Sequence, residues 1–520
     1  MTRHVRWKRV STKELLRRIP IHTFFLAAYP IVSLLAFNID QIYAQDALKS
    51  LLISLFIASL VLCGLRLLSG SWQFAGLLTS LIVMWFFIYG RLYTPLKSFS
   101  VFGWIIGRHR YLLVVWSGIV IGVAFWLKKR SRIFPDLTMV LNVFSFILIC
   151  LPALQIVTFY LRDLNHPGDQ AVDAVTPLIS WTDDSSPPDI YYIVLDEYTR
   201  SDVLEQEFGV DTTPFLEELQ EMGFYIAECA QSNYSRTTHA FASTFNMNYV
   251  QTLKSGVAPD EDPSWLLPYM KNGVVRQQLE ILGYKTIVFN NSWKRYVWDD
   301  ADIVYRSSGT GLLSPFEYLL LRTTVVRVYL DMQEAEIRQL SNYTSYDDTL
   351  YALKHLPEVP DIQGPKFVFV HLIIPHSPFV FGPNGEKIDI PYDADAGNIY
   401  TEEDYKRGYV AAVSYINKRM LEILPEIIRD SDTPPVLVLA GDHGNPWGGN
   451  RNEVKILAAF FTPGSISPFY ENITPVNIFR IIFDTYFNGS FGLLPDISYM
   501  FTKLGRFDFE GFPNTCEGSE

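Results

Sequence analysis

Side chains that can bind a metal ion or attack an electrophile gather in a few short segments that lie far apart in this sequence. Each segment ends a predicted strand or begins a predicted helix. The segments are Ile190–Asp196, Ser232–His239, Phe367–Pro378, Val436–Gly444 and Thr474–Arg480. Carboxylate oxygens and imidazole nitrogens are ligands of zinc and manganese, and a hydroxyl beside such a metal becomes a nucleophile. This combination predicts a metal site for displacement at phosphorus or a similar centre.

Buried strands are needed to bring these segments together. Continuous apolar runs at Ile190–Leu195, Phe367–Ile374 and Val436–Ala440 have the length and composition of such strands. Helical stretches separate them, for example the amphipathic Thr213–Met222 and the long Tyr405–Ile428. This alternation predicts an α/β domain whose central sheet is mostly parallel and is covered by helices on both faces.

The carboxyl ends of the predicted strands carry the candidate ligands. Asp196, His376 and the pair Asp442-His443 each follow one of the three strands, and ligands bind outside the carboxyl ends of the strands in such sheets. Each residue also has a simple structural explanation: a helix cap, an exposed loop histidine, and a turn that ends in glycine. Their coincidence at one edge of the sheet favours a metal site.

The candidate nucleophile is Thr237, in a segment that predicts a loop entering a helix, Ser232–Ser243. Hydroxyl groups at a helix N-terminus face free N–H groups, and these together with the helix dipole favour a bound anion. Thr237 could equally be a helix cap, and the two roles are compatible.

These motifs occur in the order found in the alkaline phosphatase superfamily, and the soluble part resembles the sulfatase-like branch of that superfamily. The resemblance rests on Asp196 at a strand end, Thr237 at the head of a helix, Pro-His-x-Pro-Phe at Pro375–Phe379, and Gly-Asp-His-Gly at Gly441–Gly444. It covers Pro188–Tyr499. The closing part of that range is similar to bacterial membrane proteins of the sulfatase-like hydrolase/transferase group.

By position, the resemblance implies that Asp196, Asp442, His443 and the Thr237 oxygen hold one divalent metal ion. The ion expected is manganese or zinc, with calcium ranked below both. The resemblance also implies that His376 contacts the transferred group or its leaving oxygen. No complete Asp/His set for a second metal is evident in the sequence.

Three further residues are weaker candidates for binding the substrate. His371 sits within a predicted strand, where its side chain could instead face the core. Arg451 follows the Asp-His-Gly loop, and a guanidinium group there could bind an anionic oxygen in bidentate fashion. Arg236 is a second cation, directly before the candidate nucleophile.

The sequence departs from authentic sulfatases at the nucleophile. Those enzymes use a formylglycine made within a Cys/Ser-x-Pro-x-Arg motif, whereas the matching segment here reads Ser235-Arg236-Thr237-Thr238-His239. This departure argues against the usual route of sulfate-ester hydrolysis and favours phosphoryl transfer through a covalent threonine intermediate. Thr238 stays open as the alternative nucleophile.

The first third of the chain holds the longest apolar runs. They lie at Ile21–Phe37, Leu51–Leu68, Phe74–Tyr89, Tyr111–Leu127 and Leu137–Leu161, each near the ~20 residues that a helix needs to cross a bilayer. We therefore predict a bundle of about five transmembrane helices in residues 1–164. A linker rich in Asp, Ser, Pro and Thr follows at 165–188, and the catalytic domain occupies 189–520. This architecture is similar to that of lipoteichoic acid synthase and the phosphoethanolamine transferases.

Positive residues set the predicted orientation. A basic N-terminal tail and the cluster Lys128–Arg132 are expected on the cytoplasmic side, although Arg91, Lys97, Arg108 and Arg110 would then lie outside. The tail contributes Arg3, Arg6, Lys8, Arg9, Lys13, Arg17 and Arg18. The prediction is a multi-pass protein of the cell membrane, as in a bacterial inner membrane, with its catalytic domain outside the cytoplasm.

Composition limits the partners. The net charge is −12, and no basic stripe with interleaved aromatic residues indicates a nucleic-acid partner. Cys229 and Cys516 fall in the outer domain, where a disulfide is permitted, but the sequence does not say whether they pair. The apolar spans carry almost no charged residues at their centres, which argues against a transporter.

A bilayer anchor beside the site suggests a lipid-borne donor, whose phospho-head group moves to an envelope glycan or lipid acceptor. One alternative is a tethered phospho- or sulfoester hydrolase. The other is a non-catalytic binding domain on the same scaffold.

Overall fold

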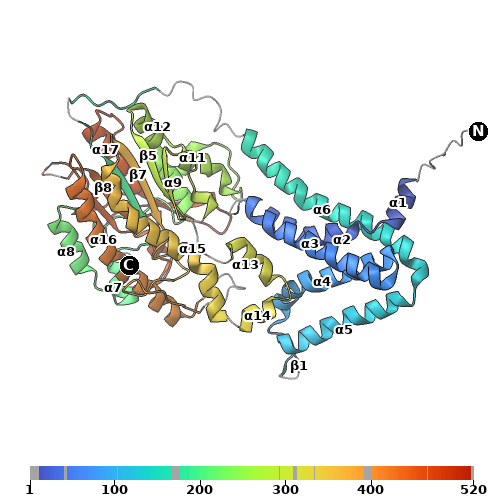
Figure 1. The fold of residues 1–520 in the computed structure, drawn as a ribbon. Coiled ribbons are helices and arrows are strands. Elements are labelled where there is room, and N and C mark those ends of the chain that lie inside the picture. Colours follow the sequence, from blue (N-terminus) through green and yellow to red (C-terminus); the bar gives the residue numbers. More distant parts are fainter. Residues whose placement is uncertain are drawn as a thin grey trace, which may run out of the picture. The chain divides into compact units, whose positions relative to one another are not determined.

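A computed structural model shows the fold of the chain (Figure 1). It describes residues 11–39, 42, 44–101, 104–165, 176–183, 186–291, 293–307, 313–332, 334–391, 400–464 and 467–516. The chain forms two compact units. The first, here called the membrane unit, comprises Met1–His166 and Gly311–Ser341, and the second, the catalytic unit, comprises Pro167–Thr310 and Asn342–Glu520. Part of the basic tail and part of the expected linker lie outside the described residues, and the predicted domain boundaries stay predictions.

The N-terminal part of the membrane unit is a short charged helix followed by a set of apolar helices. They are α1 (Thr12–Arg18), α2 (His22–Phe37), α3 (Ala44–Ser69), α4 (Trp72–Leu96), α5 (His109–Lys128) and α6 (Phe134–Asn165), with a short β1–β2 ribbon (Ser100–Val101, Trp104–Ile105) between α4 and α5. In the described part of the chain, 4 helical stretches are long and apolar enough to cross a membrane by length and composition, and α2 is a shorter apolar helix. These four to five apolar helices confirm the prediction of a bundle of about five.

Helix α2 is shorter than the hydrocarbon core of a bilayer is thick. Its 16 residues rise by about 24 Å, whereas that core measures ~30 Å. It packs against α3, α4 and α6, and half of its side chains are buried, including Ile31 and Leu35. Other helices therefore cover much of α2, so its length matters less than it would for a helix exposed to lipid.

A segment from the middle of the chain also belongs to the membrane unit. Helices α13 (Pro315–Arg322) and α14 (Arg327–Met332) lie between two strands of the catalytic unit in sequence, yet they pack on the N-terminal helices. Phe316 joins the apolar core formed by α2 and α4. The sequence analysis did not predict this excursion. The next helix, α15 (Glu334–His355), begins in the membrane unit and ends in the catalytic unit.

The catalytic unit is built on a seven-stranded sheet with the order β4-β9-β8-β3-β7-β5-β6. The strands are β3 (Ile190–Leu195), β4 (Tyr225–Ile226), β5 (Lys285–Asn290), β6 (Ile303–Arg306), β7 (Lys366–Leu372), β8 (Val436–Gly441) and β9 (Ala458–Phe461). Strands β8, β3, β7, β5 and β6 are parallel, while β9 is antiparallel to both β8 and β4. The predicted mostly parallel sheet is confirmed.

The register of the three central strands positions the site. Leu195 of β3 pairs with Leu372 of β7 on one side and with Gly441 of β8 on the other. The residues that follow these three positions therefore leave the sheet at one edge.

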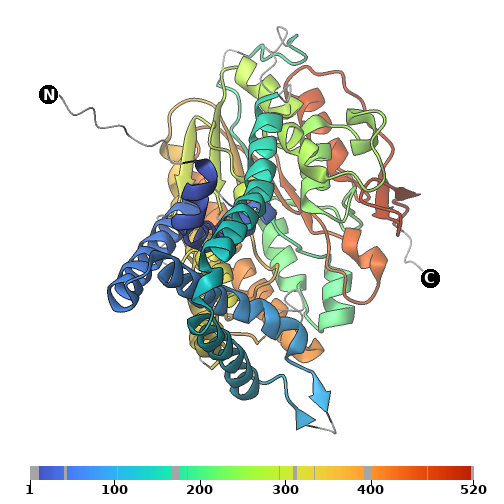
Figure 2. The same ribbon diagram turned by 90° about the vertical axis from the view of Figure 1, so that its right-hand side faces the viewer.

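Helices cover both faces of the sheet (Figures 1 and 2). Alternate residues of β3 divide between two apolar cores: Tyr191 and Ile193 join one, and Tyr192 and Val194 join the other, as the period of two in a strand requires. The first core includes side chains of α7 (Ser201–Phe208), α8 (Thr213–Glu221), α15 and α16 (Glu402–Asp430). The second includes side chains of α9 (Thr237–Asn246), α11 (Leu267–Lys271), α12 (Val274–Ile281) and α17 (Ile478–Tyr486).

A disulfide joins the C-terminal part of the catalytic unit to the loop after β4. Cys229 and Cys516 are bonded, with their Cα atoms 5.2 Å apart, which answers the question that the sequence left open. The ribbon of β10 (Ile497–Phe501) and β11 (Phe509–Pro513) lies just before Cys516. Disulfides persist in oxidising compartments, so the bond is consistent with a catalytic unit outside the cytoplasm.

Whether α2 crosses the membrane decides the number of transmembrane helices, and this number can be tested. If both the N-terminal tail and the Lys128–Arg132 cluster face the cytoplasm, an even number of helices must separate them, and α2 must then cross with α3, α4 and α5. A reporter that is active only outside the cytoplasm should therefore be active when fused after Glu520 and inactive when fused after Ser131. The reverse pattern would show that α2 does not cross or that the bundle is inverted.

Candidate functional site

Three buried side chains meet at the carboxyl ends of β3, β7 and β8. Ligand atoms of Asp196, His371 and Asp442 all lie within 4.8 Å of one another. His371 Nε2 is 3.2 Å from Asp196 Oδ2, so the strand histidine points to the site and not into the core. His443 Nε2 lies 3.7 Å from Asp196 Oδ1 and 3.6 Å from Asp442 Oδ2. These residues are here called the carboxylate–histidine cluster.

The two glycines of the Gly-Asp-His-Gly loop allow backbone segments to approach closely. A Cβ atom at Gly441 would lie 2.4 Å from the carbonyl oxygen of Tyr198, and one at Gly444 would lie 2.1 Å from that of Asn452. The N–H of Gly441 also donates to the carbonyl of Leu457 at 2.9 Å. Any larger residue would push these segments apart, so both glycines serve to hold Asp442 and His443 in place.

The cluster fits a divalent cation. Asp196 Oδ1 and Asp442 Oδ2 are buried and accept no hydrogen bond from the described part of the protein, and burying a carboxylate oxygen without a hydrogen bond is costly. Burial raises the pKa of Asp196, but His376, His371 and His443 outweigh it and hold that pKa below its usual range. Two carboxylates with imidazole nitrogens suit zinc or manganese.

Glu197 is a site residue that the sequence analysis missed. Its buried carboxylate accepts hydrogen bonds from the Tyr405 hydroxyl at 2.8 Å and from Asn445 Nδ2 at 2.9 Å. Its N–H donates to Asp442 Oδ1 at 3.1 Å, and its φ of 65° is left-handed. Burial raises the pKa of Glu197, and His376 is the largest of the effects that oppose the rise. The sequence signal that could have revealed Glu197 is that two adjacent acids, Asp196 and Glu197, follow β3.

His376 faces Glu197 on the open side of the site. Its Nε2 atom lies 3.5 Å from Glu197 Oε2, and its side chain remains 32% exposed. Burial lowers the pKa of His376, but Asp196 and Glu197 raise it to about 9. An imidazole that is partly open to solvent, beside buried acids, is placed where a substrate oxygen can reach it.

Thr237 is the first residue of α9, as predicted for the head of a helix. Tyr296 is a second residue that the sequence analysis missed: burial raises the pKa of its hydroxyl, and the neighbouring Thr238 and Thr237 oppose the rise. The Tyr296 ring lies 5.4 Å from the ring of His371, and the Phe241 ring of α9 lies 4.9 Å from it. The N-terminus of α9 therefore adjoins the carboxylate–histidine cluster. That Thr237 is a ligand and nucleophile stays a prediction.

The two candidate arginines lie by the β10–β11 ribbon. Arg236 is exposed at the N-cap of α9, and its guanidinium is 5.9 Å from the Phe501 ring. Arg451 is also exposed, 5.1 Å from the Phe512 ring. Anion binding by either residue stays a prediction.

The fifth sequence segment has a structural role. Arg480 donates to the backbone carbonyls of Met247 and Phe491 at 2.8 and 2.9 Å. Thr474 donates its N–H and hydroxyl to Asp496 Oδ1. These bonds tie α17 to neighbouring loops, so this segment supports the fold and supplies no group to the carboxylate–histidine cluster.

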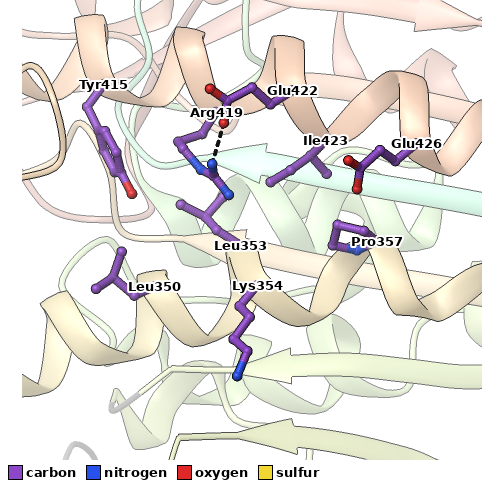
Figure 3. Close-up of a pocket in the computed structure, with 9 residues that line it drawn as sticks. All are labelled: Leu350, Leu353, Lys354, Pro357, Tyr415, Arg419, Glu422, Ile423 and Glu426. Atoms are coloured by element: carbon purple, nitrogen blue, oxygen red, sulfur yellow. Dashed lines mark hydrogen bonds and ion pairs between the residues drawn. The ribbon is translucent and has the colours of Figure 1, made fainter.

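A separate pocket lies between α15 and α16 of the catalytic unit (Figure 3). Its volume is ≈ 510 Å³, and Leu350, Lys354 and Tyr415 are among the residues that line it. An ion pair between Arg419 and Glu422 crosses its wall. The lining contains none of the predicted site residues, so this pocket is not the site of the predicted chemistry.

Comparison with known proteins defines the class of this enzyme. The model of the Sulfatase family matches residues 188–465, which is more than half of the chain. The chain therefore belongs to the Sulfatase family of the alkaline phosphatase superfamily, whose members are sulfatase-like hydrolases and transferases. The recognition made from the sequence motifs is confirmed.

Three solved structures are similar to this chain at low sequence identity. The C-terminal periplasmic domain of EptC from Escherichia coli, in complex with Zn, is 14% identical, covers 66% of this chain and 97% of its own, and gives a TM-score of 0.41. The corresponding domain of the phosphoethanolamine transferase EptC from Campylobacter jejuni is 12% identical, with coverage of 59% and 91% and a TM-score of 0.35. The putative sulfatase yidJ from Bacteroides fragilis is 14% identical, with coverage of 62% and 83% and a TM-score of 0.39. No curated protein matches.

The metal site leads to a prediction for the full-length protein purified in detergent. Elemental analysis should find near-stoichiometric zinc or manganese. The substitution Asp442→Ala removes a buried candidate ligand and should weaken metal affinity by at least about 100-fold, as even changes to residues behind the ligands can do.

Glu403→Ala is the matched control, because Glu403 is an exposed acid in the first turn of α16, and this variant should keep its metal. A wild-type protein that contains no metal and takes up none on titration would show that the site is assigned wrongly.

Proposed function

We propose that this protein is a metal-dependent phosphotransferase or phosphodiesterase, anchored in the membrane, that uses Thr237 as its nucleophile. The observation that carries the proposal is the carboxylate–histidine cluster beside the hydroxyl at the start of α9, with buried carboxylate oxygens that accept no hydrogen bond from the described residues. The absence of a formylglycine motif in the sequence separates this site from that of an authentic sulfatase.

Four residues account for the metal in this proposal. Asp196, Asp442 and His443 would hold one divalent cation near the Thr237 hydroxyl. His371, which the sequence analysis ranked only as a substrate contact, shares the space between the two carboxylates and is a candidate fourth protein ligand. The bound cation would supply positive charge that stabilises developing negative charge and lowers the pKa of a neighbouring hydroxyl.

The proposed reaction exchanges one bond at phosphorus in each of two steps. The Thr237 hydroxyl loses its proton to solvent, its oxygen forms a bond to phosphorus, and the bond from phosphorus to the donor oxygen breaks. His376 lies on the open side of the site and would give a proton to that leaving oxygen. An acceptor hydroxyl, or water in the hydrolytic case, then gives its proton to His376 and displaces the Thr237 oxygen, which regains a proton from solvent.

The proposed substrate is a phospholipid or another lipid-linked phosphodiester, and the acceptor is a glycan or lipid of the cell envelope. Two features support this choice: the apolar helices of the same chain and the sequence resemblance to lipoteichoic acid synthase and the phosphoethanolamine transferases. The Cys229–Cys516 disulfide supports a position outside the cytoplasm, because disulfides are rare in reducing compartments.

A tethered phospho- or sulfoester hydrolase is the second candidate, and the match to the Sulfatase family favours it. It differs from the first in the acceptor, which is water, and the fate of the donor lipid distinguishes the two. A purely binding role has less support, because buried carboxylate oxygens that accept no hydrogen bond within the described residues cost stability that a binding domain has no need to bear.

The nucleophile assignment can be tested with two neighbouring variants of the full-length protein. Thr237→Ala should lower phosphodiester turnover by several orders of magnitude, since a covalent nucleophile is lost. If Thr237 were only a helix cap, the change would cost about 1 kcal/mol of stability and leave the chemistry in place.

Thr238→Ala is the control, because it removes the hydroxyl of the adjacent residue and only Thr237 is proposed to attack phosphorus. The Thr238→Ala protein should keep its activity and its metal. Near-normal turnover by Thr237→Ala together with an inactive Thr238→Ala would move the nucleophile to Thr238, and normal turnover by both would refute the covalent mechanism.

A further inference from the structure

The segment 313–332, which contains α13 and α14, is held against the N-terminal helices of the membrane unit by a partly buried polar network. His109 Nε2 lies 2.9 Å from Asp331 Oδ2, and its Nδ1 atom lies 2.8 Å from the Tyr89 hydroxyl. Arg327 binds the same Asp331 oxygen through Nε at 3.2 Å and donates from Nη1 to Thr94 Oγ1 at 2.7 Å. Charged groups that bond to one another at low exposure fix a single arrangement of the elements that carry them.

Aromatic and backbone contacts strengthen the same junction. The Arg327 guanidinium lies 4.7 Å from the Tyr93 ring, and that ring stacks on His109 with centroids 3.7 Å apart. The N–H of Gly90 donates to the carbonyl of Thr323 at 2.9 Å. A Cβ atom at Gly90 would lie 2.0 Å from the carbonyl oxygen of Arg322, so α4 needs a glycine where the segment crosses it.

All of these contacts lie at one end of the helical bundle. Gly90 and Thr94 belong to the end of α4, and His109 begins α5. Lys49, in the second turn of α3, pairs with Glu317 at 2.9 Å. Because α3, α4 and α5 follow one another through short connections, the start of α3, the end of α4 and the start of α5 emerge on the same side of a membrane that they cross.

The segment also presents apolar side chains outward. Leu319, Tyr329 and Met332 are 40%, 58% and 76% exposed, while Phe316 and Leu320 are buried in the core of the bundle. With 8 and 6 residues, α13 and α14 are too short to cross a bilayer. Short helices with an outward apolar face and a tyrosine are suited to the interface between lipid tails and head groups.

We propose that segment 313–332 is a second membrane attachment, which rests in the bilayer interface and keeps the catalytic unit at the membrane surface. The chain reaches the segment from β6 and returns to the catalytic unit through α15, so the catalytic unit is tied to the membrane by this segment as well as by the stretch after α6. Under the proposed function, such an attachment raises the effective concentration of the site toward a substrate that is embedded in the bilayer.

The attachment can be tested without reference to activity. Spin labels are placed at Leu319→Cys or Tyr329→Cys in a full-length protein in which Cys63 and Cys150, the free cysteines, are changed to alanine. In phosphatidylglycerol–phosphatidylethanolamine vesicles, both labels should collide more with oxygen, which partitions into lipid, than with a water-soluble nickel complex. A label at Glu403→Cys, on the catalytic unit, should show the reverse, and labels at 319 and 329 that behave like the one at 403 would overturn the proposal.

The role in catalysis is tested by Asp331→Asn, which removes the charge shared by His109 and Arg327. Turnover of a phosphodiester lipid in vesicles should fall about tenfold or more, while turnover of a soluble nitrophenyl phosphodiester should be unchanged. Glu403→Gln, which removes the charge of an exposed acid in the catalytic unit, is the matched control and should leave turnover of both substrates within about twofold of wild type.

Equal loss of both activities, or loss of neither, would overturn the positioning role. If the wild-type protein turns over neither substrate, the proposed function fails, and the spin-label result still decides whether the segment is a membrane attachment.

Discussion

The constraint on which the site depends is the register of three parallel strands. Leu195, Leu372 and Gly441 are aligned across β3, β7 and β8, so acids that follow β3 and β8 and a histidine near the end of β7 leave the sheet together. The sheet is covered on both faces, which makes that edge a low-dielectric place for charge. Buried carboxylates are costly there unless protons, imidazoles or a metal ion compensate them, and the histidines and the predicted cation meet this need.

The surrounding backbone accepts unfavourable conformations to keep this arrangement. Glu197 takes a left-handed φ, and its carboxylate is held by Tyr405 and Asn445 from α16 and the loop after β8. Gly441 and Gly444 have no side chains, and neighbouring backbone segments can therefore lie close to them. Such features concentrate at functional sites, where surrounding structure must compensate their cost. The apolar cores of the sheet provide that compensation.

The sequence predicted those site residues whose positions follow from strand ends. Asp196, Asp442 and His443 each come directly after an apolar run, so their meeting follows from the parallel sheet. Glu197 and Tyr296 were missed because their roles depend on a left-handed backbone turn and on a loop that folds back to α9, and neither has a periodic pattern. The Cys229–Cys516 pair was undecided because 287 residues separate its members. Helices α13 and α14 were missed for a related reason: an amphipathic pattern shows that a helix packs, but not against which unit.

The central claim is that a threonine at the start of α9 carries the transferred group, and the mass of that covalent intermediate tests it most directly. The full-length protein would be incubated with envelope phospholipid, quenched in acid and digested, and the peptide containing Thr237 would be weighed and fragmented. The account predicts that a fraction of this peptide gains the mass of a phospho-head group, located on Thr237. Turnover of the lipid with no adduct on this peptide, or with the adduct on another residue, would contradict it.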